Sequence, residues 1–132
     1  MRDLDDAIRQ MDFDFFGRGR HKTTPRELLD DADGVLVDLR ADEERAVLAV
    51  APVGIRCLHL PLHELPERYA EIPRDRNVGL FCSSDNRSAI AFAYLAARGF
   101  GAARIVAGGY AALVEELKPG KVLARRSARS GE

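Results

Sequence analysis

The sequence predicts an α/β fold: a small central parallel sheet of about four to five strands, with helices covering both faces. Two observations lead to this prediction. Apolar runs of strand length lie at residues 35–39, 53–60, 78–81 and 103–106, and segments with helical periodicity separate them. Strands that alternate with helices form parallel sheets, which are buried on both sides.

The bulk composition is that of one globular domain. The chain has 132 residues, enough for a hydrophobic core, and a formal net charge of −1, which gives no general attraction to nucleic acid or membrane surfaces. No apolar run approaches the ~18 residues of a membrane span, and the start of the chain lacks the pattern of a signal peptide. We therefore expect a cytoplasmic protein that binds neither nucleic acid nor membrane.

The two cysteines, Cys57 and Cys82, are too few for a disulfide framework. In a reducing compartment such a cysteine is reactive or buried rather than bridged. No cluster of cysteine and histidine has the spacing of metal ligands, so we expect neither a metal nor a cofactor.

Residues 1–16 are predicted to form an amphipathic helix, and residues 1–22 a separate N-terminal segment with its linker. The apolar residues recur at helical spacing: Leu4, Ala7, Ile8, Met11 and Phe15. Gly17 and Gly19 end this pattern. The helix packs on its own domain or contacts a partner such as a second copy of the chain, and the sequence leaves both alternatives open.

The first half of the domain begins with a capping box. Thr24-Pro25-Arg26-Glu27 places proline at the first helical position, which predicts a helix from Pro25 to about Asp31. The strand at 35–39 and a short helix over 43–50 follow. A second strand within 53–60 ends at Pro61.

The second half alternates in the same way. Helical spacing follows Pro61, with Pro66 marking the start of that helix. The strand at 78–81 precedes a helix over 88–98, which is apolar almost all round and therefore expected to be buried. Gly99 suits the position after its C-terminus. After the strand at 103–106 comes a last helix over 110–117, stopped by Pro119-Gly120, and residues 118–132 are expected to form a flexible basic tail.

Cys82 is the strongest candidate for chemistry. It follows the strand at 78–81 directly and opens a short polar segment before the long helix. A thiolate in this position is favoured by unpaired backbone N–H groups and by the helix dipole. Four residues separate Cys82 from Arg87, so this small loop can direct several N–H groups at one sulfur. Ligands of parallel sheets bind at the carboxyl ends of strands, where Cys82 and the pair Asp38 and Arg40 all fall.

Several of these segments, in this order and spacing, resemble the rhodanese-like domains, which are sulfurtransferases. The resemblance covers roughly residues 23–117. The matching motifs are Val35-Leu36-Val37-Asp38-Leu39-Arg40 with Glu43 and Glu44, Leu58-His59-Leu60-Pro61-Leu62, the loop at 81–88, Gly99-Phe100, and Val106-Ala107-Gly108-Gly109-Tyr110-Ala111.

The resemblance implies a covalent sulfur transfer. Cys82 would attack the outer sulfur of a donor, become a persulfide, and pass that sulfur to a nucleophilic acceptor. The donor would be thiosulfate or a thiol or protein persulfide, including a cysteine desulfurase. The acceptor would be a thiol, cyanide or a sulfur-carrier protein.

Roles for the loop residues follow from the resemblance. The backbone N–H groups of residues 83–88 would stabilise the anionic persulfide, and the small or polar side chains of Ser83, Ser84, Asn86 and Ser88 let this backbone curl. Arg87 would orient an anionic donor or pair with a carboxylate that rigidifies the loop.

Residues outside the loop would support it. The carboxylate that pairs with Arg87 would be Glu43 or Glu44. Asp38 and Arg40 would support the loop from behind or form an ordinary ion pair at a strand end.

Asp85 is the departure that matters most, because many family members carry glycine there. Aspartate tolerates a positive φ better than most residues, so the loop shape can survive. Its negative charge would oppose a doubly charged donor such as thiosulfate.

A second departure lies between Glu44 and Cys57, where the family's usual Gly-His-Ile-Pro-Gly is replaced by Val50-Ala51-Pro52-Val53-Gly54-Ile55. This puts the pocket wall opposite the loop in question.

Two other functions remain open. Phosphatases and arsenate reductases on this fold use one more residue between cysteine and arginine. The present loop is one residue shorter and leaves less room for a tetrahedral oxyanion. A non-catalytic scaffold or thiol sensor is the other alternative.

Three further residues have open roles. Cys57 could resolve a persulfide as a disulfide or be an ordinary strand residue. His59 and His63 could donate protons, although sulfur transfer does not require a proton donor.

Overall fold

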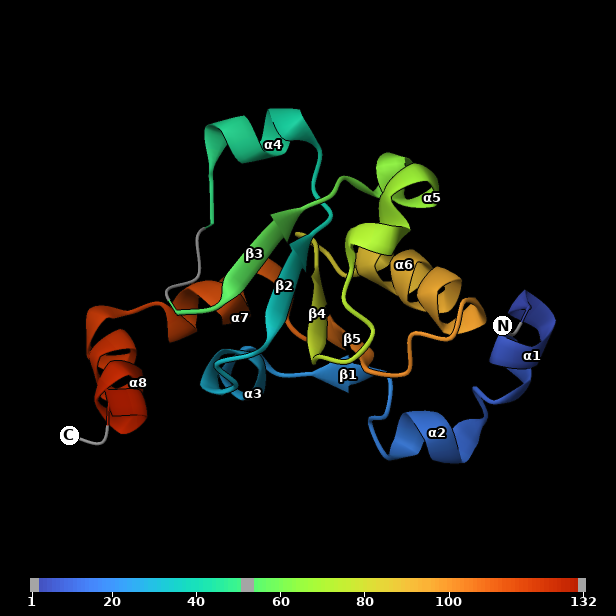
Figure 1. The fold of residues 1–132 in the computed structure, drawn as a ribbon, viewed down its shortest axis with the longest axis horizontal. Helices are drawn as coiled ribbons and strands as arrows, with labels where there is room; N and C mark the ends of the chain where they lie inside the picture. The colour runs from blue at the N-terminus through green and yellow to red at the C-terminus, as the bar shows by residue number, and fades with distance from the viewer. Residues whose placement is uncertain (1–2, 51–53, 131–132) are drawn as a thin grey trace.

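A computed structural model describes residues 3–50 and 54–130 (Figure 1). Its centre is a five-stranded sheet, parallel throughout, with the strand order β1-β5-β4-β2-β3. The predicted α/β class is therefore confirmed. The strands are β1 (Lys22–Thr23), β2 (Val35–Asp38), β3 (Arg56–His59), β4 (Val78–Phe81) and β5 (Ala103–Val106).

Helices surround this sheet. They are α1 (Leu4–Arg9), α2 (Phe13–Gly17), α3 (Pro25–Asp30), α4 (Asp42–Val47), α5 (Leu65–Arg68), α6 (Asn86–Ala97), α7 (Gly109–Glu116) and α8 (Pro119–Ser130), with the 3-10 turns η1 (Leu62–Glu64) and η2 (Tyr69–Glu71) beside α5. None of these helices in the described ranges has both the length and the apolar character that a membrane span requires.

The core consists of two layers, one on each face of the sheet. Alternate side chains of β2 point to opposite faces, so Val35 and Val37 pack with the α6 side while Leu36 packs with the α3 and α7 side. Every residue of β2 and β4 is buried, as in a parallel sheet covered on both faces.

The register of the central strands positions the site. Asp38, the last residue of β2, lies level with His59 of β3 and with Phe81 of β4. The segments that follow these three strands therefore begin side by side at one edge of the sheet.

Two local signals read from the sequence are confirmed. The Thr24 hydroxyl accepts a hydrogen bond from the backbone N–H of Glu27 at 3.1 Å, and α3 begins at Pro25. At the end of α6, Gly99 has a φ of 84°. The N–H groups of Gly99 and Phe100 bond back to the last turn of the helix, which forms a Schellman motif.

The N-terminal segment differs from the single helix that the periodicity predicts. It forms two short helices, because the Asp12 carboxylate accepts a hydrogen bond from the N–H of Phe15 at 2.9 Å and so begins α2. The first helix packs against α6 (Figure 1) and buries Ala7, whereas Leu4 and Ile8 remain about half exposed. The structure thus places α1 against its own domain.

The prediction of an entirely buried α6 is wrong. One side of the helix buries Ala91, Phe92 and Leu95, but Ile90 is 59% exposed. The many alanines carry so little apolar surface that a solvent-facing side costs little free energy.

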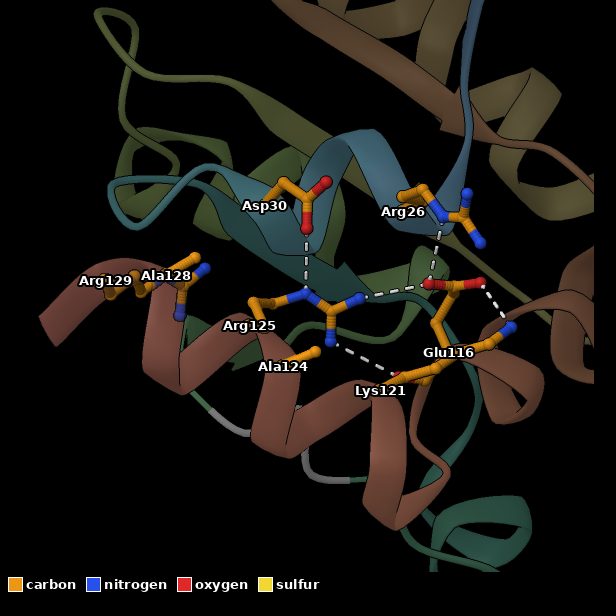
Figure 2. Close-up of a pocket in the computed structure, with 8 residues that line it drawn as sticks. All are labelled: Arg26, Asp30, Glu116, Lys121, Ala124, Arg125, Ala128 and Arg129. Atoms are coloured by element: carbon orange, nitrogen blue, oxygen red, sulfur yellow. Dashed lines mark hydrogen bonds and ion pairs between the residues drawn. The ribbon is translucent and has the colours of Figure 1, made fainter. Parts of the chain in front are cut away.

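The C-terminal segment, expected to be a flexible tail, contains a helix. Pro119 occupies the start of α8, a position where proline is favoured because the first N–H groups of a helix have no partner. Arg125 holds this helix to the domain by bonding Asp30 of α3 and Glu116 of α7, both at 3.0 Å (Figure 2). Lys121 adds a bond to Glu116 at 3.1 Å.

Candidate active site

The Cys82 thiol lies at the junction of β4 and α6. Its Sγ is 2.9 Å from the Ser88 hydroxyl and 3.4 Å from the Ser88 backbone nitrogen. Ser88 is the third residue of α6, so its N–H is among those that point out of the helix N-terminus. A donor in this position directs a positive partial charge at the sulfur. Cys82 and Ser88 are both 0% exposed.

Asp85 gives the loop its shape. Its φ is 66°, and among the described residues no other non-glycine residue has a positive φ. The turn at Asp85 directs the chain into α6, where the carbonyl of Asp85 accepts the N–H of Ala89 at 3.0 Å. The expectation that aspartate tolerates a positive φ in this loop is confirmed. One carboxylate oxygen of Asp85, Oδ1, is buried and has no hydrogen-bond partner among the described residues.

The backbone N–H groups of the loop remain available. Residues 83–87 donate no backbone hydrogen bond to an acceptor in the described part of the chain, and only Ser88 directs its N–H at Sγ. The sequence predicts several N–H groups around the sulfur itself, and the structure provides one. The others are unpaired donors in a tight turn, which is the property of an anion-binding loop.

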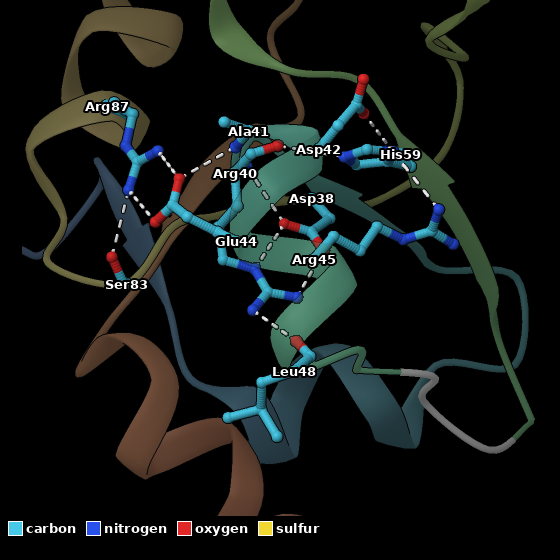
Figure 3. A network of polar contacts seen from close by, with 10 residues as sticks. All are labelled: Asp38, Arg40, Ala41, Asp42, Glu44, Arg45, Leu48, His59, Ser83 and Arg87. Carbon is cyan, nitrogen blue, oxygen red and sulfur yellow. Dashed lines mark hydrogen bonds and ion pairs between the residues drawn. The ribbon is translucent and has the colours of Figure 1, made fainter.

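Arg87 ties the loop to α4, as Figure 3 shows. Its guanidinium makes a two-pronged pair with Glu44, in which Nη2 bonds Oε2 at 2.9 Å and Nη1 bonds Oε1. Nη2 also donates to the Ser83 hydroxyl at 3.1 Å. Glu44, not Glu43, is therefore the carboxylate partner. Glu43 is exposed and has no hydrogen bond or ion pair with the described residues.

The pair holds Glu44 in its ionised form. Hydrogen bonds from Arg87 and from the backbone N–H of Ala41, the latter at 2.9 Å, lower the pKa of Glu44 from 4.5 to about 2. The loop is consequently closed by a full ion pair at neutral pH.

Asp38 and Arg40 form a buried ion pair that acts on α4 rather than on the loop. Arg40 bonds both carboxylate oxygens of Asp38, at 3.0 and 2.8 Å, and the side chains are 4% and 1% exposed. The remaining terminal nitrogen of Arg40 donates to the carbonyl of Leu48 at 2.8 Å, at the end of α4 (Figure 3). Of the two predicted alternatives, the structure shows the strand-end ion pair, and its bond to Leu48 anchors the helix that carries Glu44.

Comparison with known proteins identifies the family of this domain. Residues 24–116 match the rhodanese-like domain family. The chain belongs to the rhodanese-like family.

Three relatives illustrate the match. A protein from Allochromatium vinosum named sulfurtransferase is 39% identical over 84 residues, which are 64% of this chain and 75% of the relative. The structure of a rhodanese-related protein from Thermoplasma volcanium has a TM-score of 0.60 at 24% identity and covers 75% of this chain and 95% of its own. The structure of an NAD-dependent persulfide reductase from A. fulgidus has a TM-score of 0.55 at 28% identity, over 74% of this chain and 17% of its own.

Gly109 lies at this rhodanese-like site, although its sequence context indicates no role beyond a place in a family motif. A Cβ atom on Gly109 would lie 2.8 Å from the carbonyl oxygen of Ser83 and 3.4 Å from that of Cys82, and its φ is 58°. The start of α7 therefore packs closely against the backbone of the Cys82–Ser88 loop, and only glycine allows this approach. The Gly108-Gly109 pair directly after a strand was the available signal.

The other sequence candidates lie outside the loop. Cys57 pairs with Leu36 across β2 and β3 and shares its sheet face, whereas Cys82 belongs to the core of the opposite face. His59 bonds the carbonyl of Arg40 at 3.0 Å, and His63 is exposed beside Glu64. The predicted departure at the pocket wall includes residues 51–53, which lie outside the described residues. Across residues 3–50 and 54–130, no cluster of histidine, cysteine and carboxylates could hold a metal ion.

We predict that Glu44→Gln weakens the pH dependence of stability in acid. The folded-state pKa of Glu44 is lowered, so its stabilisation is complete above the ordinary value of 4.5 and is lost as the pH falls towards about 2. Urea unfolding between about pH 6 and pH 2.5 should give a shallower decline for the variant. At neutral pH the variant should lose only about 0.5–1 kcal/mol, because both side chains remain partly in water. Glu43→Gln is the matched control and should keep the wild-type profile; identical profiles for both variants would contradict the assignment.

Gly109→Ala should lower the free energy of unfolding by about 1–3 kcal/mol, since a Cβ atom meets the Ser83 carbonyl and the left-handed φ disfavours alanine. Amide NMR shifts should change across residues 82–88. Gly120→Ala is the control, because a Cβ atom there has no neighbour within 4 Å. Equal unfolding energies for the two variants would show that α7 does not press on the loop.

Proposed function

We propose that this protein is a single-domain sulfurtransferase that carries sulfane sulfur as a persulfide on Cys82. Membership of the rhodanese-like family and the relative named sulfurtransferase support sulfur transfer as the class of reaction. One observation carries the assignment to Cys82: its Sγ faces the N-terminus of α6 beneath a loop of unpaired N–H groups. This environment favours both a thiolate and an anionic adduct one atom further out.

The reaction proceeds in two displacements. The Cys82 thiolate attacks the outer sulfur of a donor, so that a new S–S bond forms while the donor's own bond to that sulfur breaks. The bonding electrons leave with the rest of the donor, as sulfite from thiosulfate or as a thiolate from a persulfide. An acceptor nucleophile then takes the outer sulfur and regenerates the Cys82 thiolate, so no external oxidant or cofactor is needed.

In this reaction Ser88 acts on the sulfur, whereas Arg87 acts on the loop. The Ser88 N–H and hydroxyl would stabilise the thiolate, and the unpaired N–H groups of residues 83–87 would stabilise the charge of the outer sulfur. Arg87 is engaged by Glu44 and Ser83. It therefore rigidifies the loop rather than clamping an anionic donor.

A thiol or protein persulfide suits this site better than thiosulfate. Asp85 sits in the loop, and Glu44 cancels the nearest fixed positive charge, so a dianion meets little net attraction. The persulfide reductase from A. fulgidus contains a domain of similar structure, which agrees with persulfide chemistry. Because Cys82 is 0% exposed, residues of the loop must move aside when a donor reaches the sulfur.

Intact mass measured after loading tests the proposal. The reduced protein is incubated with thiosulfate and, separately, with glutathione persulfide. Wild type and Cys57→Ser should each gain one sulfur atom that cyanide removes, and Cys82→Ser should gain none. No added sulfur from either donor, on a folded protein with a free thiol, would instead favour the scaffold or thiol-sensor function.

A pair of variants at Asp85 tests the charge argument. Asp85→Asn removes the charge and keeps a side chain that tolerates positive φ, and Asp85→Gly also relieves the backbone strain. Both should load from thiosulfate several-fold faster than wild type at low ionic strength, and the gain should shrink at high salt. If only the glycine variant is faster, backbone shape rather than charge limits thiosulfate use; if neither is faster, the electrostatic argument is wrong.

A further inference from the structure

A cavity of about 190 Å³ lies between the N-terminal helices and the start of β5. Its walls come from the α1–α2 segment, from α6 and from residues 100–104, near where α1 and α2 sit in Figure 1. Ala103 is the first residue of β5, whereas Cys82 follows the last residue of β4. The cavity is thus at the amino ends of the parallel strands and the Cys82–Ser88 loop is at their carboxyl ends.

Two arginines line this cavity without a carboxylate to neutralise them. Arg20 and Arg104 are the charged residues of its lining, and neither has an ion pair with the described residues. Two backbone carbonyls fix the Arg104 guanidinium, those of Gly101 at 2.6 Å and Ala103 at 3.1 Å. Its remaining nitrogens have no acceptor in the described part of the chain.

The surroundings of Arg104 are unfavourable to its positive charge. Burial and the nearby charge of Arg20 lower the pKa of the Arg104 guanidinium. The two guanidinium groups line one cavity without a counter-charge, so they repel each other. An anion bound between them would remove that repulsion and gain charge-assisted hydrogen bonds.

Apart from Gln10, the other side chains of the lining are apolar. Met11, Phe15, Phe92 and Phe100 contribute to the walls, and the rings of Phe15 and Phe92 lie 6.1 Å apart. The Arg20 guanidinium carbon lies 6.0 Å from the centre of the Phe15 ring. The cavity thus combines a cationic side with aromatic walls, which suits a ligand with an anionic group on an apolar body.

We propose that this cavity binds a small organic carboxylate, with its anionic group between Arg20 and Arg104 and its apolar body against Phe15, Phe92 and Phe100. A volume of 190 Å³ corresponds to the liquid volume of about six water molecules. That size admits an aromatic or branched acid of roughly benzoate size. The site is separate from Cys82, so the proposal does not depend on the sulfur-transfer reaction.

Titration of the full-length protein with benzoate tests this site, with ¹H–¹⁵N NMR as the readout. Saturable shifts are expected at Gly101 and Arg104, together with a rise in melting temperature. Two probes dissect the ligand: benzyl alcohol keeps the ring without the charge, and inorganic phosphate keeps the charge without the ring. Both should bind at least about tenfold more weakly than benzoate.

Charge-neutral variants complete the test. Arg104→Gln and Arg20→Gln should each weaken benzoate binding by about tenfold or more, and both should stay folded because each relieves a repulsion between like charges. Arg126→Gln, which removes the same charge from an exposed position on α8, should bind like wild type. The proposal is overturned by non-saturable shifts, by phosphate binding as tightly as benzoate, or by equal losses in Arg126→Gln and Arg104→Gln.

Discussion

The shared register of β2, β3 and β4 is the constraint on which the functional architecture depends. Asp38, His59 and Phe81 lie level at the carboxyl ends of their strands. The residues at these strand ends therefore meet at one edge of the sheet. Arg40 follows β2 and holds the end of α4, His59 bonds the carbonyl of Arg40, and the Cys82 loop follows β4. A slip of one residue in β2 would turn Asp38 towards the other sheet face and leave α4 without the Arg40 contact that holds its end.

Three elements hold the Cys82–Ser88 loop from three directions. The N-terminus of α6 provides the Ser88 N–H beneath the sulfur, and α4 holds Arg87 through Glu44. The start of α7 meets the loop backbone at Gly109. Because the loop is held from outside, Asp85 can keep a left-handed conformation that costs about 1 kcal/mol or more. The backbone N–H groups of residues 83–87, which have no acceptor in the described part of the chain, belong to this supported loop, and in the proposed reaction they would stabilise the developing anion.

The molecule uses its arginines in contrasting ways. Arg40, Arg87 and Arg125 are paired with carboxylates. Arg87 and Arg125 join elements that are distant in sequence, whereas Arg40 joins the end of β2 to α4, which follows it directly. Arg20 and Arg104 face a common cavity with no carboxylate in its lining. The paired arginines are structural, since their charge is cancelled where they act, and the unpaired ones retain the charge that a ligand would recognise.

The sequence by itself determined the local features: alternating strands and helices, the cap at Thr24, the Schellman glycine at Gly99, and a cysteine loop whose aspartate tolerates positive φ. Each of these depends on residues within a few positions of one another. The tertiary structure alone decided the long-range partners. It selected Glu44 over its neighbour Glu43, placed Gly109 against the loop, and made a helix of the tail by pairing Arg125 with Asp30, 95 residues away. Such pairings arise from strand register and packing, which bring together side chains that no local pattern relates.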